Sequence, residues 1–413
     1  MEPPFPNSGG RFFVVLYERL SSFLQPTNPA MSKVIADVLL VSPKSLIRPV
    51  SVVIDDEGRI QQIHEGHEPP AGSDVIMDGG GELYLFAGFI DIHTHGANGA
   101  DLSLGTFEAV ASIAEAKLSE GVTTFLPTTW TSSPEETLKM ARAATTYRKN
   151  QSFARAPFLH IEGPYLNPDQ AGAQDPCQMR EPDIEEIQKV HELCPVGLVS
   201  LAVELNGACD FISAAKEMGI VTSAAHSAAT YNEYRAARKA GLSHLTHFCN
   251  QMSPLHHREI GLVGAGLLDD SIMTEIICDG VHLCPDMVQL AFKIIGSKRI
   301  MLVTDSMAAS HLGNGTYPQG NTTITVKDGA ARIPAGNLAG SILTFDQALR
   351  NVIEFTGLPL NEVSRSCALN QARSLSLRDR GDIKQGLLAD LTLLTRKLEV
   401  VAVFVGGERR FSS

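Results

Sequence analysis

The sequence of 413 residues has no apolar run long enough to cross a membrane, since a transmembrane helix needs about 18 or more consecutive apolar residues. Positive charge is also scarce: 34 Lys and Arg stand against 46 Asp and Glu, which gives a formal net charge of −12. Nucleic acids and anionic membranes attract clustered cations, so we expect neither as a main partner. The Gly-rich motifs that cradle nucleotides, GxGxxG and GxxxxGK[ST], do not open any predicted helix.

Cysteine is scarce as well. The seven cysteines are scattered and form no CxxC pair, which favours reduced thiols in a cytoplasmic protein over a disulfide framework. Glycine and proline, with 35 and 22 residues, stay well below the roughly one quarter of the chain that marks low complexity. Hydrophobic residues make up 44% of the chain and can form a large core. Composition therefore predicts a globular cytoplasmic protein.

The N-terminal 30 residues differ from the rest. They begin with a Pro- and Gly-rich stretch, and the apolar run of residues 12–17 is interrupted by Glu18 and Arg19. The core of a signal peptide usually has about 7–15 apolar residues, so this run is too short. We expect residues 1–30 to be a disordered extension outside the fold.

The two ends of the folded chain resemble each other. Residues 33–85 contain short strand-like runs with a hairpin turn at residues 56–58, and residues 388–413 contain further strands with a turn at Gly406 and Gly407. Lone hairpins are marginally stable. We therefore expect residues 31–85 and 380–413 to form one small β-sandwich domain together.

The middle of the chain, residues 86–379, alternates between apolar runs and helical patterns. Helical patterns at residues 106–120 and 133–149 open with Thr or Ser before acidic residues, as helix N-caps do. This alternation predicts a (β/α)8 barrel of the TIM type, with an open doubly wound sheet as the alternative. The eight predicted strands are residues 86–92, 122–127, 157–161, 196–203, 220–225, 243–248, 273–278 and 300–304.

Chemically active side chains follow these predicted strands. In a barrel, the carboxyl ends of the strands meet at one rim, so we expect the residues at those ends to meet there. A single His at a strand end is more often a hydrogen-bonded structural residue, but so many in phase favours a functional site. The residues are His93, His95, Glu162, His226, His247, His282 and Asp305.

The spacing of these residues suggests metal binding. His93 and His95 are two positions apart and point to the same side of their strand. Imidazole and carboxylate together suit a divalent transition metal such as zinc or iron. Buried imidazoles and acids would also be costly without such a partner.

Several motifs resemble the N-acetylglucosamine-6-phosphate deacetylase family of the amidohydrolase superfamily. The resemblance runs from about residue 33 to residue 410 and keeps the order of the motifs. These motifs are AGFIDIHTHG at residues 87–96, HIEGPYLN at 160–167, AHS at 225–227, THFCNQM at 246–252, DGVH at 279–282 and VTDSM at 303–307.

The resemblance implies a metal-dependent deacetylase acting on an N-acetylated amino-sugar phosphate. It assigns Glu162, His226 and His247 as metal ligands, and His93 with His95 leaves a second metal ion open. Asp305 would be the catalytic base, and His282 would contact the substrate carbonyl. The family also implies substrate contacts from Asn250, Gln251, His257, Arg258, Ile342, Leu343 and Thr344.

Within that set, Asn250 and Gln251 would lie on the phosphate side, and Arg258 would reach the neighbouring subunit's site in a homodimer. This chain departs from the family at three places: Gln174 stands where a His is usual, Gln251 is bulkier than usual, and His311 is an additional imidazole. These departures leave the substrate open, so that Gln174 and Gln251 count as candidate substrate contacts. A different N-acyl sugar, an N-acyl amino acid or a cyclic amide remain alternatives, and a non-enzymatic metal-binding barrel is disfavoured because Asp305 is present.

Overall fold

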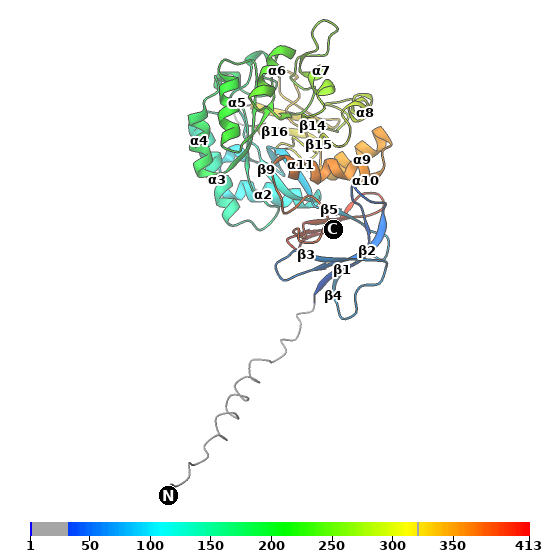
Figure 1. The fold of residues 1–413 in the computed structure, drawn as a ribbon. Helices are drawn as coiled ribbons and strands as arrows, with labels where there is room; N and C mark the ends of the chain where they lie inside the picture. Colours follow the sequence, from blue (N-terminus) through cyan, green and yellow to red (C-terminus); the bar gives the residue numbers. More distant parts are fainter. Residues whose placement is uncertain (2–31, 320–321) are drawn as a thin grey trace.

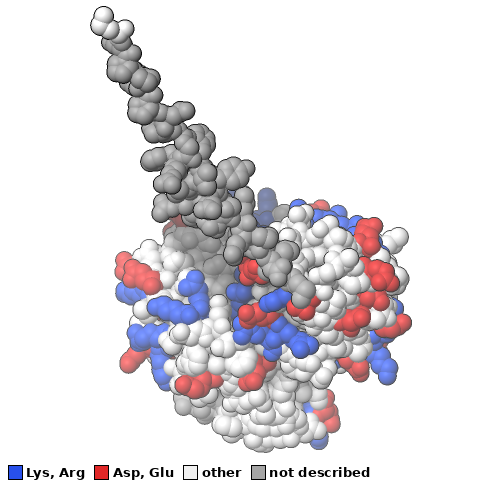
Figure 2. Space-filling model, turned by 90° about the horizontal axis from the view of Figure 1, so that it is seen from below, with Lys and Arg blue, Asp and Glu red and all other residues white. Residues whose placement is uncertain are grey.

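The computed structural model describes residues 1, 32–319 and 322–413 (Figure 1). The predicted N-terminal extension, residues 1–30, lies outside these residues except for Met1. None of the described helices is long and apolar enough to span a membrane. On the face seen in Figure 2, Lys and Arg side chains are mixed with Asp and Glu.

Strands from both ends of the chain share one sheet, which lies at one end of the molecule below the helices (Figure 1). The order is β21-β20-β19-β5-β1-β2-β3, with β4 paired to β1. Apolar side chains from both ends, among them Ile35, Val52, Leu391 and Phe404, are almost fully buried in one cluster. The strands are β1 (Lys33–Leu40), β2 (Arg48–Ile54), β3 (Ile60–Glu65), β4 (Asp74–Asp78), β5 (Tyr84–Ala87), β19 (Leu391–Leu394), β20 (Val400–Val405) and β21 (Glu408–Ser412).

The middle of the chain contains two groups of parallel strands. Strands β10 to β15 form a six-stranded sheet in chain order, and β6 pairs with β9. Isolated parallel bridges from Thr128 to His160 and from Thr94 to Ser306 connect this pair to both edges of the six-stranded sheet. The bounds are β6 (Phe89–Thr94), β9 (Val122–Pro127), β10 (Leu159–Glu162), β11 (Val196–Leu201), β12 (Val221–Ala224), β13 (His244–Leu245), β14 (Met273–Ile277) and β15 (Ile300–Val303).

Helices follow these strands and cover them from outside (Figure 1). Thr106 and Ser133 cap α2 and α3 with their side chains, and Ser133 forms a capping box with Glu136. The helices are α2 (Phe107–Ser119), α3 (Pro134–Lys149), α4 (Ile184–Leu193), α5 (Ala208–Glu217), α6 (Tyr231–Ala240), α7 (Gly261–Leu268), α8 (Pro285–Ile294), α9 (Phe345–Thr356), α10 (Leu360–Ser364) and α11 (Asn370–Ser374), with short turns η1 (Leu102–Leu104), η2 (Pro168–Gln170), η3 (Pro176–Gln178) and η4 (Arg365–Leu369).

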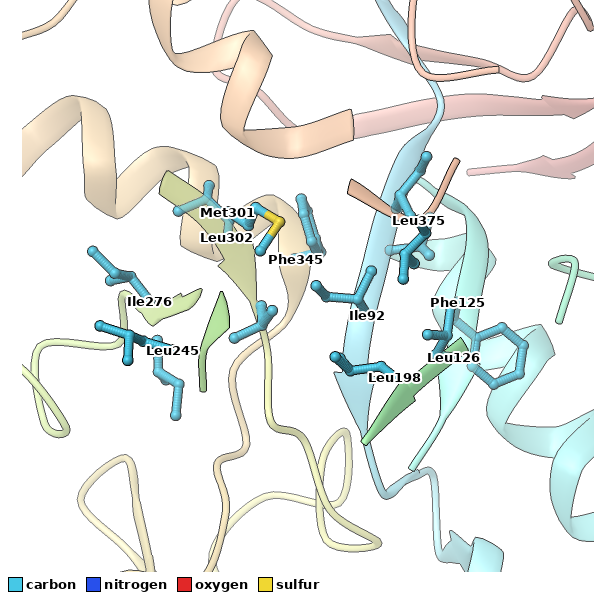
Figure 3. Packing of buried hydrophobic residues seen from close by; sticks show 14 of the residues in the cluster. Ile92, Phe125, Leu126, Leu198, Leu245, Ile276, Met301, Leu302, Phe345 and Leu375 are labelled. Carbon is cyan, nitrogen blue, oxygen red and sulfur yellow. The ribbon is translucent and has the colours of Figure 1, made fainter. Parts of the chain in front are cut away.

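The two faces of the buried strands have different neighbours. Ile92, Phe125 and Ile276 belong to the large hydrophobic cluster, on the faces of their strands that meet the helices (Figure 3). Asp91 and His93, on the opposite face of β6 from Ile92, contact polar groups of distant strands instead. The strand faces that oppose the helices therefore carry the polar side chains of the site.

Two small antiparallel β-structures were not predicted from the sequence. Between β15 and α9, three antiparallel strands form a separate small sheet around Met307, Ala309 and Ile324. These strands are β16 (Gly315–Gln319), β17 (Thr322–Lys327) and β18 (Ala330–Arg332), and a further short pair is β7 (Gly96–Ala97) with β8 (Ala100–Asp101). The loop after β18 runs to the strand-end rim, so that this small sheet supports part of the site wall.

Candidate active site

Glu162, at the end of β10, lies at the centre of the candidate site. Its Oε1 lies 3.1 Å from Nε2 of His247, 3.4 Å from Nε2 of His93 and 3.6 Å from Nε2 of His226. Its Oε2 lies 3.1 Å from Nε2 of His95. One carboxylate therefore touches four imidazoles that come from three different strand ends.

These side chains form two groups that share Glu162. His93, His95 and Glu162 form one group, and Glu162, His226 and His247 form the other. Within each group the donor atoms lie within 4.8 Å of one another, and every member is buried. Nitrogen and carboxylate donors at this spacing suit zinc or a similar transition metal.

The hydrogen bonds of the imidazoles show that the site fits a cation. Nδ1 of His95 donates to the carbonyl of Thr128 at 3.2 Å, and Nδ1 of His226 donates to the carbonyl of Gln170 at 2.7 Å. A ring that donates from Nδ1 in its neutral form presents a lone pair at Nε2. In that form the Nε2 lone pairs face carboxylate oxygens, so either a proton on Nε2 or a metal ion between the groups must supply positive charge. Nε2 of His93 is likewise buried without a hydrogen-bond partner among the described residues.

Backbone conformation helps to aim three of these side chains. His226, His247 and Asp305 have positive φ angles of 43°, 31° and 49°. Residues other than glycine rarely adopt this conformation, and it occurs most often where a functional geometry is enforced. Each of the three stands two positions beyond the last residue of a strand and lines the same cavity as Glu162.

Asp305 borders the first group. Its Oδ1 lies 3.3 Å from Nε2 of His95 and 3.4 Å from Nε2 of His93. Burial raises the pKa of the Asp305 carboxyl, but the neighbouring His93 and His95 outweigh burial and lower the pKa below its usual value. The same contacts act on His95, where burial opposes protonation but Asp305 and Glu162 raise the pKa to about 9. Asp305 is therefore held as a carboxylate.

His282 lines the same cavity as His95. Its Nδ1 is 2.7 Å from Oδ2 of Asp279. Burial lowers the pKa of His282, but the hydrogen bond and charge of Asp279 raise it above its ordinary value. This pairing leaves Nε2 as the ring nitrogen available to a bound molecule.

A cavity of about 160 Å³ opens above the two groups. Asn250 and Gln251 line it, as does Gln174, whose Nε2 donates to Oε2 of Glu162 at 2.6 Å. Oε1 of Gln174 accepts the backbone N–H of Thr131 at 2.8 Å. The residue that departs from the family pattern therefore contacts the central carboxylate directly.

Other predicted residues lie away from this cavity. His257 and Arg258 are exposed, and neither is among the described residues that line it. Ile342 and Thr344 are half-buried and Leu343 is buried in the hydrophobic core, while the wall is formed by Asn337, Leu338 and Gly340 from the same loop. His311 pairs with Glu120 at 2.9 Å instead of lining the cavity.

Sequence reasoning missed Trp130. Its ring stacks on His95 with centroids 4.0 Å apart, and its Nε1 donates to Asp101 at 3.0 Å. Trp130, Ala173 and Gln174 also line a second cavity of about 750 Å³. Trp130 is the single tryptophan of the chain and lies three residues beyond the end of β9. Its position after a predicted strand could have identified it as a residue near the site.

Residues 84–410 match the model of the Amidohydrolase family. An N-acetylglucosamine-6-phosphate deacetylase from Bacillus subtilis is 33% identical over 395 residues, covering 93% of this chain and 98% of that protein. The chain belongs to the N-acetylglucosamine-6-phosphate deacetylase family of amidohydrolases.

Two further relatives bear on the substrate. An N-acetylgalactosamine-6-phosphate deacetylase from Escherichia coli O157:H7 is 35% identical over 329 residues, covering 78% of this chain and 87% of that protein. The structure of an N-acetyl-D-glucosamine-6-phosphate deacetylase variant from Mycobacterium smegmatis, in complex with N-acetyl-D-glucosamine-6-phosphate, superposes with a TM-score of 0.86. It is 30% identical, and the match covers 92% of this chain and all of that one. The predicted family membership is confirmed.

Proposed function

We propose that this protein hydrolyses the acetamide of N-acetylglucosamine 6-phosphate to acetate and glucosamine 6-phosphate. The observation that carries the proposal is the pair of donor groups sharing Glu162 beside Asp305, at the bottom of an open cavity. The family relationship supports the same reaction, since relatives that match almost the whole chain are named for it.

We also infer that β6 and β9 to β15 close into a (β/α)8 barrel within residues 86–379. The two parallel bridges at the edges of the six-stranded sheet support this closure. The sheet built from residues 31–85 and 380–413 would then fold over its shared apolar cluster as a β-sandwich. In such a barrel the carboxyl ends of the strands form the active-site rim, which is where Glu162 and Asp305 lie.

Two sets of residues would hold the metal. Glu162, His226 and His247 would hold one ion, and His93, His95 and Glu162 a second, with zinc or iron as the expected element. A divalent ion bound there would polarise the amide carbonyl and make water more acidic.

Asp305 would act as the general base and then as the general acid. Its carboxylate, charged at neutral pH, can accept a proton from the attacking water. The same oxygen can then return that proton to the amine nitrogen, which must be protonated before it leaves. Position supports this role, because Asp305 lines the cavity and contacts His93 and His95 of one donor group.

His282 would act on the other side of the amide. Asp279 orients the ring through Nδ1, so that Nε2 can donate to the carbonyl oxygen as negative charge develops on it. One such donor contributes roughly 3–4 kcal/mol to stabilising the transition state.

Asn250 and Gln251 would contact the phosphate side of the sugar, and Ile342, Leu343 and Thr344 would belong to the loop that covers it. His257 and Arg258 are exposed and away from the cavity of their own subunit. That position suits the proposal that Arg258 reaches the substrate phosphate of a neighbouring subunit in a homodimer. The seven free cysteines suit a reducing compartment such as the cytoplasm.

A second candidate substrate is N-acetylgalactosamine 6-phosphate. The relative named for that substrate is 35% identical to this chain. The two sugars differ only in the orientation of one hydroxyl, and the same acetamide chemistry serves both. Acetate release from both sugar phosphates, and from unphosphorylated N-acetylglucosamine, would rank the candidates by kcat/KM.

The variant Asp305→Asn tests the proposed reaction. We expect the metal content to stay unchanged and kcat to fall by about 100- to 10,000-fold, since a positioned acid–base group contributes that much. Asp210→Asn, an exposed residue of α5, is the matched control and should keep full activity. Near-normal turnover of Asp305→Asn at full metal content would refute the assignment.

A further inference from the structure

Glu275, in the middle of β14, is a fully buried carboxylate that none of the preceding roles uses. Its Oε2 accepts the Nδ1–H of His93 at 3.2 Å. Its backbone carbonyl accepts the N–H of Phe248 at 2.8 Å, directly after His247. Glu275 therefore touches one residue of the first donor group and the backbone beside a residue of the second.

The surroundings of Glu275 are unusual for a carboxylate. Its neighbours on β14 are mostly apolar, and the only ion-pair partner it has among the described residues is His93. Oε1 has no hydrogen-bond partner among them. Burying an acid with a single ion-pair partner costs free energy, so the contact with His93 is the feature of these surroundings that accounts for a carboxylate at this position.

The position of the contact on the imidazole ring shows what that role is. The Nδ1–H of His93 points at Glu275, which leaves Nε2 as the nitrogen that faces Oε1 of Glu162 at 3.4 Å and that would face a bound ion. His93 is the member of its donor group whose Nδ1 hydrogen bond ends on a carboxylate, whereas that of His95 ends on the carbonyl of Thr128. A carboxylate partner both fixes the ring and makes its nitrogen more basic.

We propose that Glu275 is a positioning residue for the second metal ion, which it secures by orienting His93. The inference rests on the proposed metal-dependent function. The contact to Phe248 is made by the backbone of Glu275. We therefore expect substitutions of the Glu275 side chain to leave His247 and its donor group with Glu162 and His226 in place. The effect is therefore selective for the ion held by His93, His95 and Glu162.

Three substitutions separate the reach of the acceptor from its charge. Glu275→Gln keeps an acceptor oxygen at the same distance. Glu275→Asp keeps the charge but shortens the side chain by one methylene, and Glu275→Leu removes the acceptor at similar volume. Thr274→Val is the matched control, because Thr274 is the neighbouring buried residue on β14 and its hydroxyl has no hydrogen-bond partner among the described residues.

The measurement is the number of zinc ions per subunit and their dissociation constants, obtained by elemental analysis in zinc buffers of defined free concentration. We expect two ions in the wild type and in Thr274→Val. In Glu275→Leu and Glu275→Asp the second ion should bind about 10- to 100-fold more weakly with the first unchanged, as losses of such partners do. Glu275→Gln should retain most of the wild-type affinity for the second ion. The double variant His93→Asn with Glu275→Leu should bind zinc no more weakly than His93→Asn alone.

Each other outcome overturns a defined statement. The role of Glu275 would be refuted if Glu275→Leu and Glu275→Asp bound both ions with the wild-type affinity. It would also be refuted if both ions were weakened equally. If Glu275→Leu does not fold, Glu275→Asp decides the question by the same criterion. A wild-type protein with one ion would refute the inference and leave the proposed reaction intact, whereas a wild-type protein that binds no metal would refute the proposed function itself.

Discussion

Lys117 on α2 is a side chain whose loss should strongly destabilise the fold, although it does not line the cavity. It is fully buried, and its Nζ lies 3.1 Å from Oδ2 of Asp91 and 3.0 Å from Oε2 of Glu120. The same ammonium donates to the hydroxyls of Thr304 at 3.1 Å and Ser306 at 2.9 Å, the residues on either side of Asp305.

The variant Lys117→Met removes the only Lys or Arg charge that contacts these two carboxylates among the described residues. Breaking a buried ion pair by deleting one partner costs about 3–5 kcal/mol, because the remaining charge is uncompensated. A typical free energy of unfolding is about 5–15 kcal/mol, so this is a large part of the total. Burial already raises the pKa of Asp91, with Lys117 opposing it. In the variant Asp91 can take up a proton, which limits the cost and makes it smaller at low pH.

Urea unfolding followed by circular dichroism would measure the effect, with exposed Lys189 on α4 changed to Met as the control. We expect a loss of about 4 kcal/mol for Lys117→Met and a change within about 0.5 kcal/mol for Lys189→Met. A loss below about 1 kcal/mol for Lys117→Met would show that the buried cluster does not need its cation.

Two further predictions concern the wall of the site. Gln174→Leu removes the donor to Oε2 of Glu162, so we expect roughly 10- to 100-fold weaker metal binding, measured by chelator competition; unchanged affinity would exclude a role for Gln174 in holding Glu162. Asp279 raises the pKa of His282 above its ordinary 6.5, so the pair stabilises the protein fully below pH 6.5 and loses this contribution as pH rises through the folded-state pKa. The destabilisation by Asp279→Asn in the metal-free protein should therefore shrink with increasing pH in thermal unfolding, and a pH-independent loss would contradict this.

Much of the architecture was predictable because buried parallel strands are continuous apolar runs. Strand β9 and the start of α3 lie where the sequence predicted them. The predicted strand at residues 86–92 is instead divided between β5, in the terminal sheet, and β6. Gly88 separates the two where the chain packs on Thr123, because a Cβ there would lie 2.2 Å from that side chain. An uninterrupted apolar run cannot reveal such a division.

The residues that support the site could not be predicted in the same way. Glu275 lies 182 positions from His93 in the chain, and Lys117 lies 187 positions from Thr304. Neither follows a strand end, so the rule that selected Asp305 passes over both. His311 was noted because an imidazole is unusual there, but its partner Glu120 is also far away in sequence. Local patterns identify which residues reach the rim, whereas tertiary contacts decide what holds them.

Strand β6 shows why the rim needs positive charge. Asp91, His93 and His95 project from one face of the chain at successive levels. At the lowest level Asp91 is paired with the Lys117 ammonium. At the next level His93 receives a single carboxylate, Glu275, on its inner nitrogen.

At the uppermost level two further carboxylates, Glu162 and Asp305, meet His95 and His93. Among the described residues their ion-pair partners are all histidines, and the two carboxylates in turn raise the pKa of His95 to about 9. Two buried negative charges are stable only beside positive charge. Protonated imidazoles can supply it in the metal-free protein, and a bound divalent ion would replace those protons. The chain supplies that charge from Lys117 at the lowest level. At the rim, which is open to the cavity, it comes from imidazoles that would give up their protons to a bound ion.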